Sequence, residues 1–223
     1  AAGGKVYHDV TSRRWAKKGL DCGVDGLIAV NRNAGGHAGP TSAEALLEEV
    51  GDLGLPVVCA GGVATPDDFA AVLRMGYAGA QCGTRFIATD ECSASDPYTA
   101  AVVDADADDI VLTERITGVP VAVIDTPWVR AIGTRASPIE RWMLRGHRRK
   151  HWMRTIYALR SIRKLKKSLT ASEGTKTYWQ AGRSVAGIED IQPTARIVRQ
   201  FMDAARALQS RDSIHLRQET PSS

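Results

Sequence analysis

The sequence has little of what builds disulfide frameworks or membrane spans. Only four of its 223 residues are cysteines, and they show neither Cys-x-x-Cys spacing nor the density of a disulfide scaffold, so we expect reduced thiols in a cytoplasmic protein. No apolar run approaches the roughly 18 residues that a membrane-spanning helix needs. The chain does not open on a basic segment followed by an apolar one, so a secretory signal is not expected.

Two common patterns of catalytic and ligating residues are also missing. No Gly-x-Ser-x-Gly elbow supplies a nucleophilic serine, and the five histidines share no ligand spacing. His147 and His151 are four residues apart, but they lie within a cluster of positive charge that would repel a cation. The sequence therefore predicts no metal site.

Positive charge is concentrated in one stretch. Between Arg135 and Lys167 there are twelve Lys or Arg and a single acid, Glu140. Apolar residues recur there every three or four positions from Trp152 to Leu169, which indicates an amphipathic helix. Its basic face could be the solvated side of a helix that covers the domain, or it could bind nucleic acid, an anionic membrane, an acidic carrier protein or a phosphorylated substrate arm.

Short apolar runs alternate with helical patterns over the first 90 residues. Strands are expected at Lys5–Val10, Val24–Val30, Pro56–Ala60 and Ala78–Cys82. Helices are expected at Arg13–Leu20, from the capping box Thr41-Ser-Ala-Glu44 to about Leu53, and from Pro66 to Met75. This order predicts parallel strands with right-handed crossovers, which both a doubly wound sheet and a (β/α)8 barrel satisfy.

Glycine-rich turns after the predicted strands favour the barrel. Asn33–Gly39 follows the second strand, Gly61-Gly62 the third and Gly83-Thr84 the fourth. Backbone amides at such turns bind anions, and barrels commonly hold phosphate on the loops after strands seven and eight. We therefore predict that the chain is the C-terminal half, strands 5–8, of a (β/α)8 barrel within a longer protein.

One histidine stands among these glycines. His37 has an ordinary pKa of about 6.5, so it can exchange a proton near neutral pH, and the flanking glycines let a substrate approach. A histidine in a loop is also commonly a surface or capping residue, and the residues alone leave both interpretations open. The hydroxyl of Thr84 adds a donor to the phosphate site, whereas Arg85 either pairs with the phosphate or forms an outward salt bridge.

The chain is expected to divide into three parts. Residues 1–134 form the barrel half, with a helix at Asp96–Asp106 and a hairpin made of Ile110–Thr113 and Pro120–Ile124. Residues 135–175 form the basic helical segment, and residues 176–223 form a closing helix, Ile191–Leu208, and a tail. Half a barrel leaves two strand edges unpaired, which favours aggregation or a homo-oligomer.

Several motifs taken together resemble the nitronate monooxygenase family. They are Asp25-Gly26, Ala34-Gly-Gly-His-Ala-Gly39, Ala60-Gly-Gly-Val63, Gln81-Cys-Gly-Thr-Arg-Phe86, Thr113-Glu-Arg-Ile-Thr-Gly-Val-Pro120 and Tyr178-Trp-Gln-Ala-Gly182. The resemblance implies a TIM barrel that binds FMN, with contacts from Gly35, Gly36, Gly61, Gly62, Gln81, Gly83 and Thr84.

The resemblance also implies a reaction. His37 would be the base that takes a proton from a nitroalkane or orients a nitronate, and O2 would reoxidise the flavin as carbonyl compound and nitrite are released. Members of the family often have an acid where this chain has Asn33, so the charge near His37 differs.

Two alternatives stay open. A related flavin enzyme, such as an enoyl-acyl-carrier-protein reductase that uses NAD(P)H, would share the barrel, and the basic segment would suit its carrier or a CoA phosphate arm. The non-enzyme alternative is a basic protein that binds nucleic acid or a membrane and uses the barrel as a scaffold.

Overall fold

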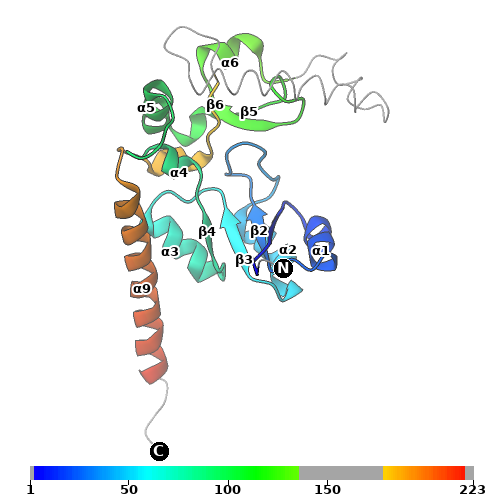
Figure 1. Cartoon of the computed structure of the whole chain (residues 1–223), viewed down its shortest axis with the longest axis vertical. Helices are drawn as coiled ribbons and strands as arrows, with labels where there is room; N and C mark the ends of the chain where they lie inside the picture. The colour runs from blue at the N-terminus through cyan, green and yellow to red at the C-terminus, as the bar shows by residue number, and fades with distance from the viewer. Residues whose placement is uncertain (1–2, 136–177, 219–223) are drawn as a thin grey trace, which may run out of the picture.

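Four parallel strands form the central sheet of the computed structural model, which describes residues 3–135 and 178–218 (Figure 1). In sheet order they are β1 (Tyr7–Val10), β2 (Gly26–Val30), β3 (Val57–Ala60) and β4 (Gly79–Gln81). Each begins within two residues of its predicted start. Because Val30 pairs with Ala60 and Ala60 with Gln81, the carboxyl ends of the strands meet at one edge. The predicted α/β fold with a parallel sheet is confirmed.

Three helices connect these strands, and local chemistry fixes their ends. They are α1 (Arg13–Asp21), α2 (Ala43–Val50), which continues into the 3-10 turn η1 (Gly51–Leu53), and α3 (Pro66–Met75). In α3, Thr65 Oγ1 accepts from the Asp68 amide at 3.1 Å and Asp68 accepts from the Thr65 amide at 2.9 Å, and Gly76 ends the helix with φ +107°. The cap of α2 is Ser42, one residue later than the predicted box implies.

A second layer follows β4. It consists of α4 (Thr84–Ile87), α5 (Asp96–Asp104), η2 (Ala107–Asp109), β5 (Ile110–Thr113), β6 (Val121–Ile124) and α6 (Pro127–Ile132). β5 and β6 pair antiparallel, with Ile110 opposite Ile124, which confirms the predicted hairpin. Ala122 of β6 donates to the carbonyl of Gly36 at 2.7 Å, so the hairpin is joined to the loop that follows β2.

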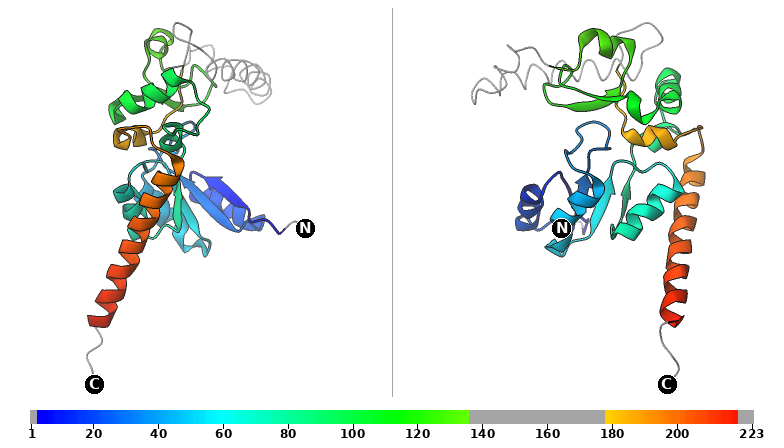
Figure 2. Two further views of the ribbon diagram at one scale, coloured as in Figure 1. Left: turned by 60° about the vertical axis from the view of Figure 1, so that its left-hand side comes forward. Right: turned by 180° about the vertical axis from the view of Figure 1, so that it is seen from behind.

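The C-terminal part adds η3 (Arg183–Gly187) and α9 (Thr194–Gln218). α9 runs beside α3 and projects past the sheet (Figures 1 and 2), and the rings of Phe69 and Phe201 stack between the two helices at 5.2 Å. The helix begins three residues later than predicted because the carboxylate of Glu91 accepts from the amide of Thr194 at 2.9 Å and fixes its start. It continues beyond the predicted end because no glycine or proline interrupts it before Pro221.

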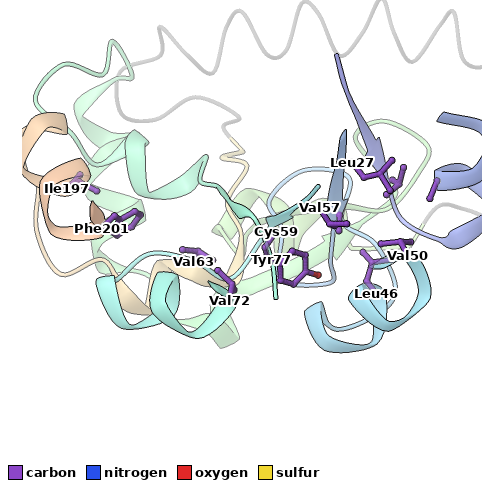
Figure 3. Close-up of a cluster of buried hydrophobic side chains, with 13 residues drawn as sticks. Leu27, Leu46, Val50, Val57, Cys59, Val63, Val72, Tyr77, Ile197 and Phe201 are labelled. Atoms are coloured by element: carbon purple, nitrogen blue, oxygen red, sulfur yellow. The ribbon is translucent and has the colours of Figure 1, made fainter. Parts of the chain in front are cut away.

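The main apolar core lies between the sheet and its helices (Figure 3). Side chains from the strands, the crossover helices and α9 meet there: Leu27, Leu46, Val50, Val57, Cys59, Val63, Val72, Tyr77, Ile197 and Phe201. A second buried cluster joins α5, the hairpin and the segment 181–188, and it includes Tyr98, Val102 and Val185. The two clusters hold the hairpin layer next to the sheet.

Some predictions fall on residues that the structure does not describe. The basic segment, residues 135–175, lies outside the described residues apart from Arg135, so the division into three parts stays a prediction. Across residues 3–135 and 178–218, no helix is both long and apolar enough to cross a bilayer. In the same ranges, no group of three or more His, Cys, Asp or Glu could hold a metal ion.

Candidate functional site

A cavity of about 630 Å³ opens at the carboxyl ends of the strands. It is lined by Asp9 of β1, Val30 of β2, Ala60 of β3 and Gln81 of β4, so the loops that follow these strands surround it. A cavity of this volume is large enough for a cofactor or substrate. The structure brings all the predicted site residues together on its wall: Gly35, Gly36, His37, Gly61, Gly62, Gln81, Gly83 and Thr84.

Asn31 fixes the loop after β2, which carries the histidine. Its side chain is fully buried, its Nδ2 donates to the carbonyl of Gly61 at 2.9 Å, and its Oδ1 accepts from the amide of Asn33 at 2.8 Å. Its backbone carbonyl accepts from the amides of Ala34 and Gly39, each at 3.2 Å. One buried carboxamide therefore joins the loop after β2 to the loop after β3. This residue was not predicted, although a polar residue directly after a buried strand was the available signal.

Gly61 has to be a glycine. Its φ of +110° is one that other residues rarely adopt, and a Cβ there would lie 2.7 Å from both the Cα of Ala34 and the Oδ1 of Asn31. Gly62 has a φ of +81°, and a Cβ added there would lie only 3.2 Å from the side chain of Asn33. The two loops meet because neither glycine carries a side chain.

The loops after β3 and β4 offer donors for an anion. Among the described residues, the backbone N–H groups of Gly62, Gly83 and Thr84 have no hydrogen-bond partner. Thr84 is buried, and its Oγ1 accepts from the amide of Gly182 at 3.0 Å, which leaves its hydroxyl proton to be donated. All three residues line the cavity, and neutral donors from two neighbouring loops suit a phosphate group.

Arg85 does not take part in this donor set. Its guanidinium is buried away from the cavity and donates to the carbonyl of Asp190 at 3.1 Å, with the carboxylate of the same residue at 3.9 Å. Burial lowers the pKa of Arg85, and Asp190 opposes this effect. Of the two predicted roles, the structure therefore shows the ion pair.

Two thiols close to the site are protonated. Burial raises the pKa of Cys59 and of Cys82 to about 11 in each case. Cys82 lines the cavity, but a thiol that holds its proton at neutral pH is a poor nucleophile. Neither cysteine is therefore a candidate for covalent catalysis.

His37 is exposed to the cavity at a tight turn. The amide of Ala38 donates to the carbonyl of Gly36 at 3.0 Å, which brings the chain around the histidine. The imidazole makes no hydrogen bond to any residue in the described ranges, so none of these residues occupies its nitrogens. This arrangement suits a general base and differs from a capping histidine, whose ring would be bonded to the backbone.

A segment far along the chain completes the cavity. Gln180 and Ser184 line it, and Tyr98 of α5 donates from its hydroxyl to the carbonyl of Gln180 at 2.5 Å. Gly182 sits so close to the loop after β2 that a Cβ there would be 2.7 Å from the amide of Gly35. The sequence did not predict that Tyr98, Gln180 and Ser184 line the cavity, although the Tyr178–Gly182 motif indicated that this segment matters.

The sequence is similar to a known protein family and to several curated proteins. The family model described as nitronate monooxygenase matches residues 2–203. A Mycobacterium tuberculosis protein named (3aS,4S,5R,7aS)-5-hydroxy-7a-methyl-1-oxo-octahydro-1H-indene-4-carboxyl-CoA dehydrogenase is 34% identical over 60% of this chain and 40% of its own. A probable nitronate monooxygenase of Staphylococcus saprophyticus is 31% identical over 56% of this chain and 39% of its own. The chain thus spans about two fifths of these curated relatives.

Solved structures agree with this comparison. FabK from Thermotoga maritima, in its M276A mutant form, has a TM-score of 0.72 and 26% identity over 93% of this chain and 63% of its own. The nitroalkane oxidase of Streptomyces ansochromogenes has a TM-score of 0.69 and 26% identity over 93% of this chain and 60% of its own. Because the family model covers most of the sequence, the chain belongs to the nitronate monooxygenase family, a family of enzymes.

Proposed function

We propose that the chain provides the FMN site of a flavin-dependent oxidoreductase. The observation that carries this proposal is that Gly62, Gly83 and Thr84, whose amides have no partner among the described residues, line one cavity that also exposes His37. These donors would hold the FMN phosphate, and Gly35, Gly36, Gly61 and Gln81 would line the rest of the cofactor. When bound, FMN supplies an electron acceptor and donor, while the protein binds, orients and moves protons.

The reaction that we propose is oxidation of an alkyl nitronate or nitroalkane to a carbonyl compound and nitrite with O2. His37 takes the proton from the carbon next to the nitro group, or holds the nitronate when the substrate arrives deprotonated. The exposure of His37 to the cavity supports this role. The substrate is a small molecule, and O2 is the second substrate.

A second candidate is oxidoreduction of an acyl thioester on CoA or an acyl carrier protein, with NAD(P)H as electron donor. The Mycobacterium tuberculosis relative is named as a dehydrogenase of a carboxyl-CoA, and the likeness to FabK fits this alternative. The twelve Lys and Arg of residues 135–167 would attract phosphates of CoA or an acidic carrier. The non-enzyme alternative gains no support from the match to an enzyme family.

Anaerobic reduction of the bound flavin distinguishes the two reactions. The FMN-loaded protein is mixed with ethyl nitronate or with NADPH, and the loss of oxidised-flavin absorbance is followed. Fast reduction by ethyl nitronate supports nitronate oxidation, whereas fast reduction by NADPH followed by reoxidation with crotonyl-CoA supports the thioester candidate. Replacing His37 with Asn should slow reduction by nitroethane, about 100-fold or more, because a general base contributes roughly that factor. Absence of bound flavin contradicts both.

We further propose that the four-stranded sheet is the second half of an eight-stranded barrel. Within the described residues β1 and β4 each pair on one side only, and FabK matches over 63% of its length. The other strands would come from another part of a longer polypeptide or from a second copy of this chain. Sedimentation of the 223-residue chain tests this: self-association is expected, and a stable monomer contradicts it.

A further inference from the structure

The segment that completes the cavity places a carboxamide beside the proposed base. Gln180 lines the cavity, and its Oε1 would lie 3.4 Å from a Cβ added to Gly36. Because Gly36 directly precedes His37, the carboxamide and the imidazole belong to the same part of the wall. The carboxamide makes no hydrogen bond to another residue in the described part of the chain.

The backbone that carries this carboxamide is firmly held. The hydroxyl of Tyr98 donates to the carbonyl of Gln180 at 2.5 Å, and burial raises the pKa of Tyr98, so the hydroxyl keeps the proton that it donates. An antiparallel bridge pairs Gln180 with Val123 of β6, and two residues further on Gly182 donates to Thr84. A fixed backbone with a free polar side chain is typical of a ligand-binding residue.

Two backbone donors beside His37 are already engaged. The amide of Gly36 donates to the carbonyl of Ala122 at 3.3 Å, and the amide of Ala38 donates to the carbonyl of Gly36 at 3.0 Å. Neither amide that flanks the histidine is therefore free to bind a substrate oxygen. The carboxamide of Gln180, which lies next to Gly36, offers a side-chain donor at this turn.

The proposed chemistry requires such a donor. When His37 takes a proton from the carbon of a nitroalkane, the C–H bond breaks, an N–H bond forms, and the electron pair moves onto an adjacent oxygen. In the reduction of an enoyl thioester the proton moves the other way, from His37 to the α-carbon of the enolate that hydride addition to the β-carbon leaves. In both reactions an oxygen next to the reacting carbon carries the negative charge. This oxygen belongs to the nitro group in one case and to the thioester carbonyl in the other. A preorganised donor aimed at the developing charge is commonly the largest single contribution to such a step.

We propose that the carboxamide of Gln180 donates a hydrogen bond to this oxygen, so that Gln180 and His37 together bind carbon acids that form an oxyanion. The proposal rests on the proposed function, because it assumes that His37 faces the substrate. It adds a residue to the site and defines the substrate class by the oxygen that both candidate substrates share.

The test replaces Gln180 with Leu, which keeps a similar size and removes both donor and acceptor. Gln209→Leu, on the exposed surface of α9, is the matched control. Propionate, which has the shape and charge of ethyl nitronate but cannot be oxidised, is titrated into the FMN-loaded proteins and followed by the flavin spectrum. Flavin reduction by nitroethane, and crotonyl-CoA turnover with NADPH, are measured as functions of pH.

The expected result separates oxyanion binding from a structural role. Q180L should bind FMN as wild type does, bind propionate about tenfold more weakly, and lose about 100-fold in limiting rate with the substrate that the wild type uses. The pH dependence of the rate should stay unchanged because His37 is retained, and Q209L should match wild type. The substrate whose rate falls in Q180L shows whether Gln180 binds a nitro oxygen or a thioester carbonyl oxygen.

Two other results would overturn the proposal in different ways. Wild-type rates and propionate affinity in Q180L would refute the role of Gln180 while leaving the proposed function intact, and loss of FMN binding in Q180L would show a structural role instead. A wild-type chain that binds no FMN would remove the proposed function and this inference together.

Discussion

Replacing Asn31 with Ala should destabilise the protein more than any other single polar deletion around the cavity. The side chain is fully buried and joins the loops after β2 and β3 through bonds to Gly61 at 2.9 Å and Asn33 at 2.8 Å. Its removal leaves the carbonyl of Gly61 and the amide of Asn33 without these partners.

The magnitude follows from these bonds. Each neutral hydrogen bond contributes about 1 kcal/mol, and a buried polar group left unsatisfied costs about 1–3 kcal/mol. The free energy of unfolding should therefore fall by about 3 kcal/mol in N31A. Because the two loops would separate, the dissociation constant for FMN should rise at least about tenfold, which corresponds to about 1.4 kcal/mol.

Urea unfolding followed by circular dichroism measures the first effect, and quenching of FMN fluorescence measures the second. N33A is the matched control because Asn33 lies in the same loop, is half-buried and makes no side-chain hydrogen bond within the described residues. The free energy of unfolding of N33A should be less than about 1 kcal/mol below that of the wild type. If N31A is no less stable than N33A, the view that this carboxamide holds the two loops together is wrong.

Three further predictions test other parts of the structure. G61A should lower the free energy of unfolding by at least about 2 kcal/mol in urea because its φ is +110° and its Cβ would meet backbone, whereas G79A, with nothing within 4 Å, should change it by less than about 0.5 kcal/mol. Phe201→Ala should cost about 3 kcal/mol by thermal unfolding because it empties the contact between α3 and α9, and a loss below about 1 kcal/mol would contradict that packing. Hydrogen bonds from Thr194 hold the pKa of Glu91 below its ordinary value in the folded protein. The stabilisation that the ionised Glu91 carboxylate provides should therefore be present in full above about pH 4.3, and it should be lost as the pH falls through the lower pKa of the folded state. E91Q should therefore lower the melting temperature at pH 7 but not at pH 2, and an equal decrease at both would refute this cap.

Sequence patterns predicted the sheet because each strand carries its signal locally. In the run Leu27-Ile-Ala-Val30, Leu27 and Ala29 are buried and Ile28 and Val30 are partly buried, and the glycine that ends α3 adopts the left-handed conformation expected of it. The predicted site residues share one cavity because parallel strands bring their carboxyl ends to the same edge.

The sequence could not show what depends on contacts between distant segments. Asn31 looks like any polar residue after a strand, and its role exists only because Gly61 lies beside it. The start of α9 depends on Glu91, which is 103 residues away from Thr194. Gln180 enters the cavity because the segment around it pairs with β6, a contact that no local pattern indicates.

The central claim is that the loops after β3 and β4 bind the phosphate of FMN. Its most direct test compares the dissociation constants of FMN and riboflavin, which differ by that phosphate, for the 223-residue chain. We expect FMN to bind at least about 100-fold more tightly, because hydrogen bonds to a charged group contribute about 1.5–3 kcal/mol each. Replacing Thr84 with Val should remove part of this preference. Equal affinities for FMN and riboflavin would contradict the claim.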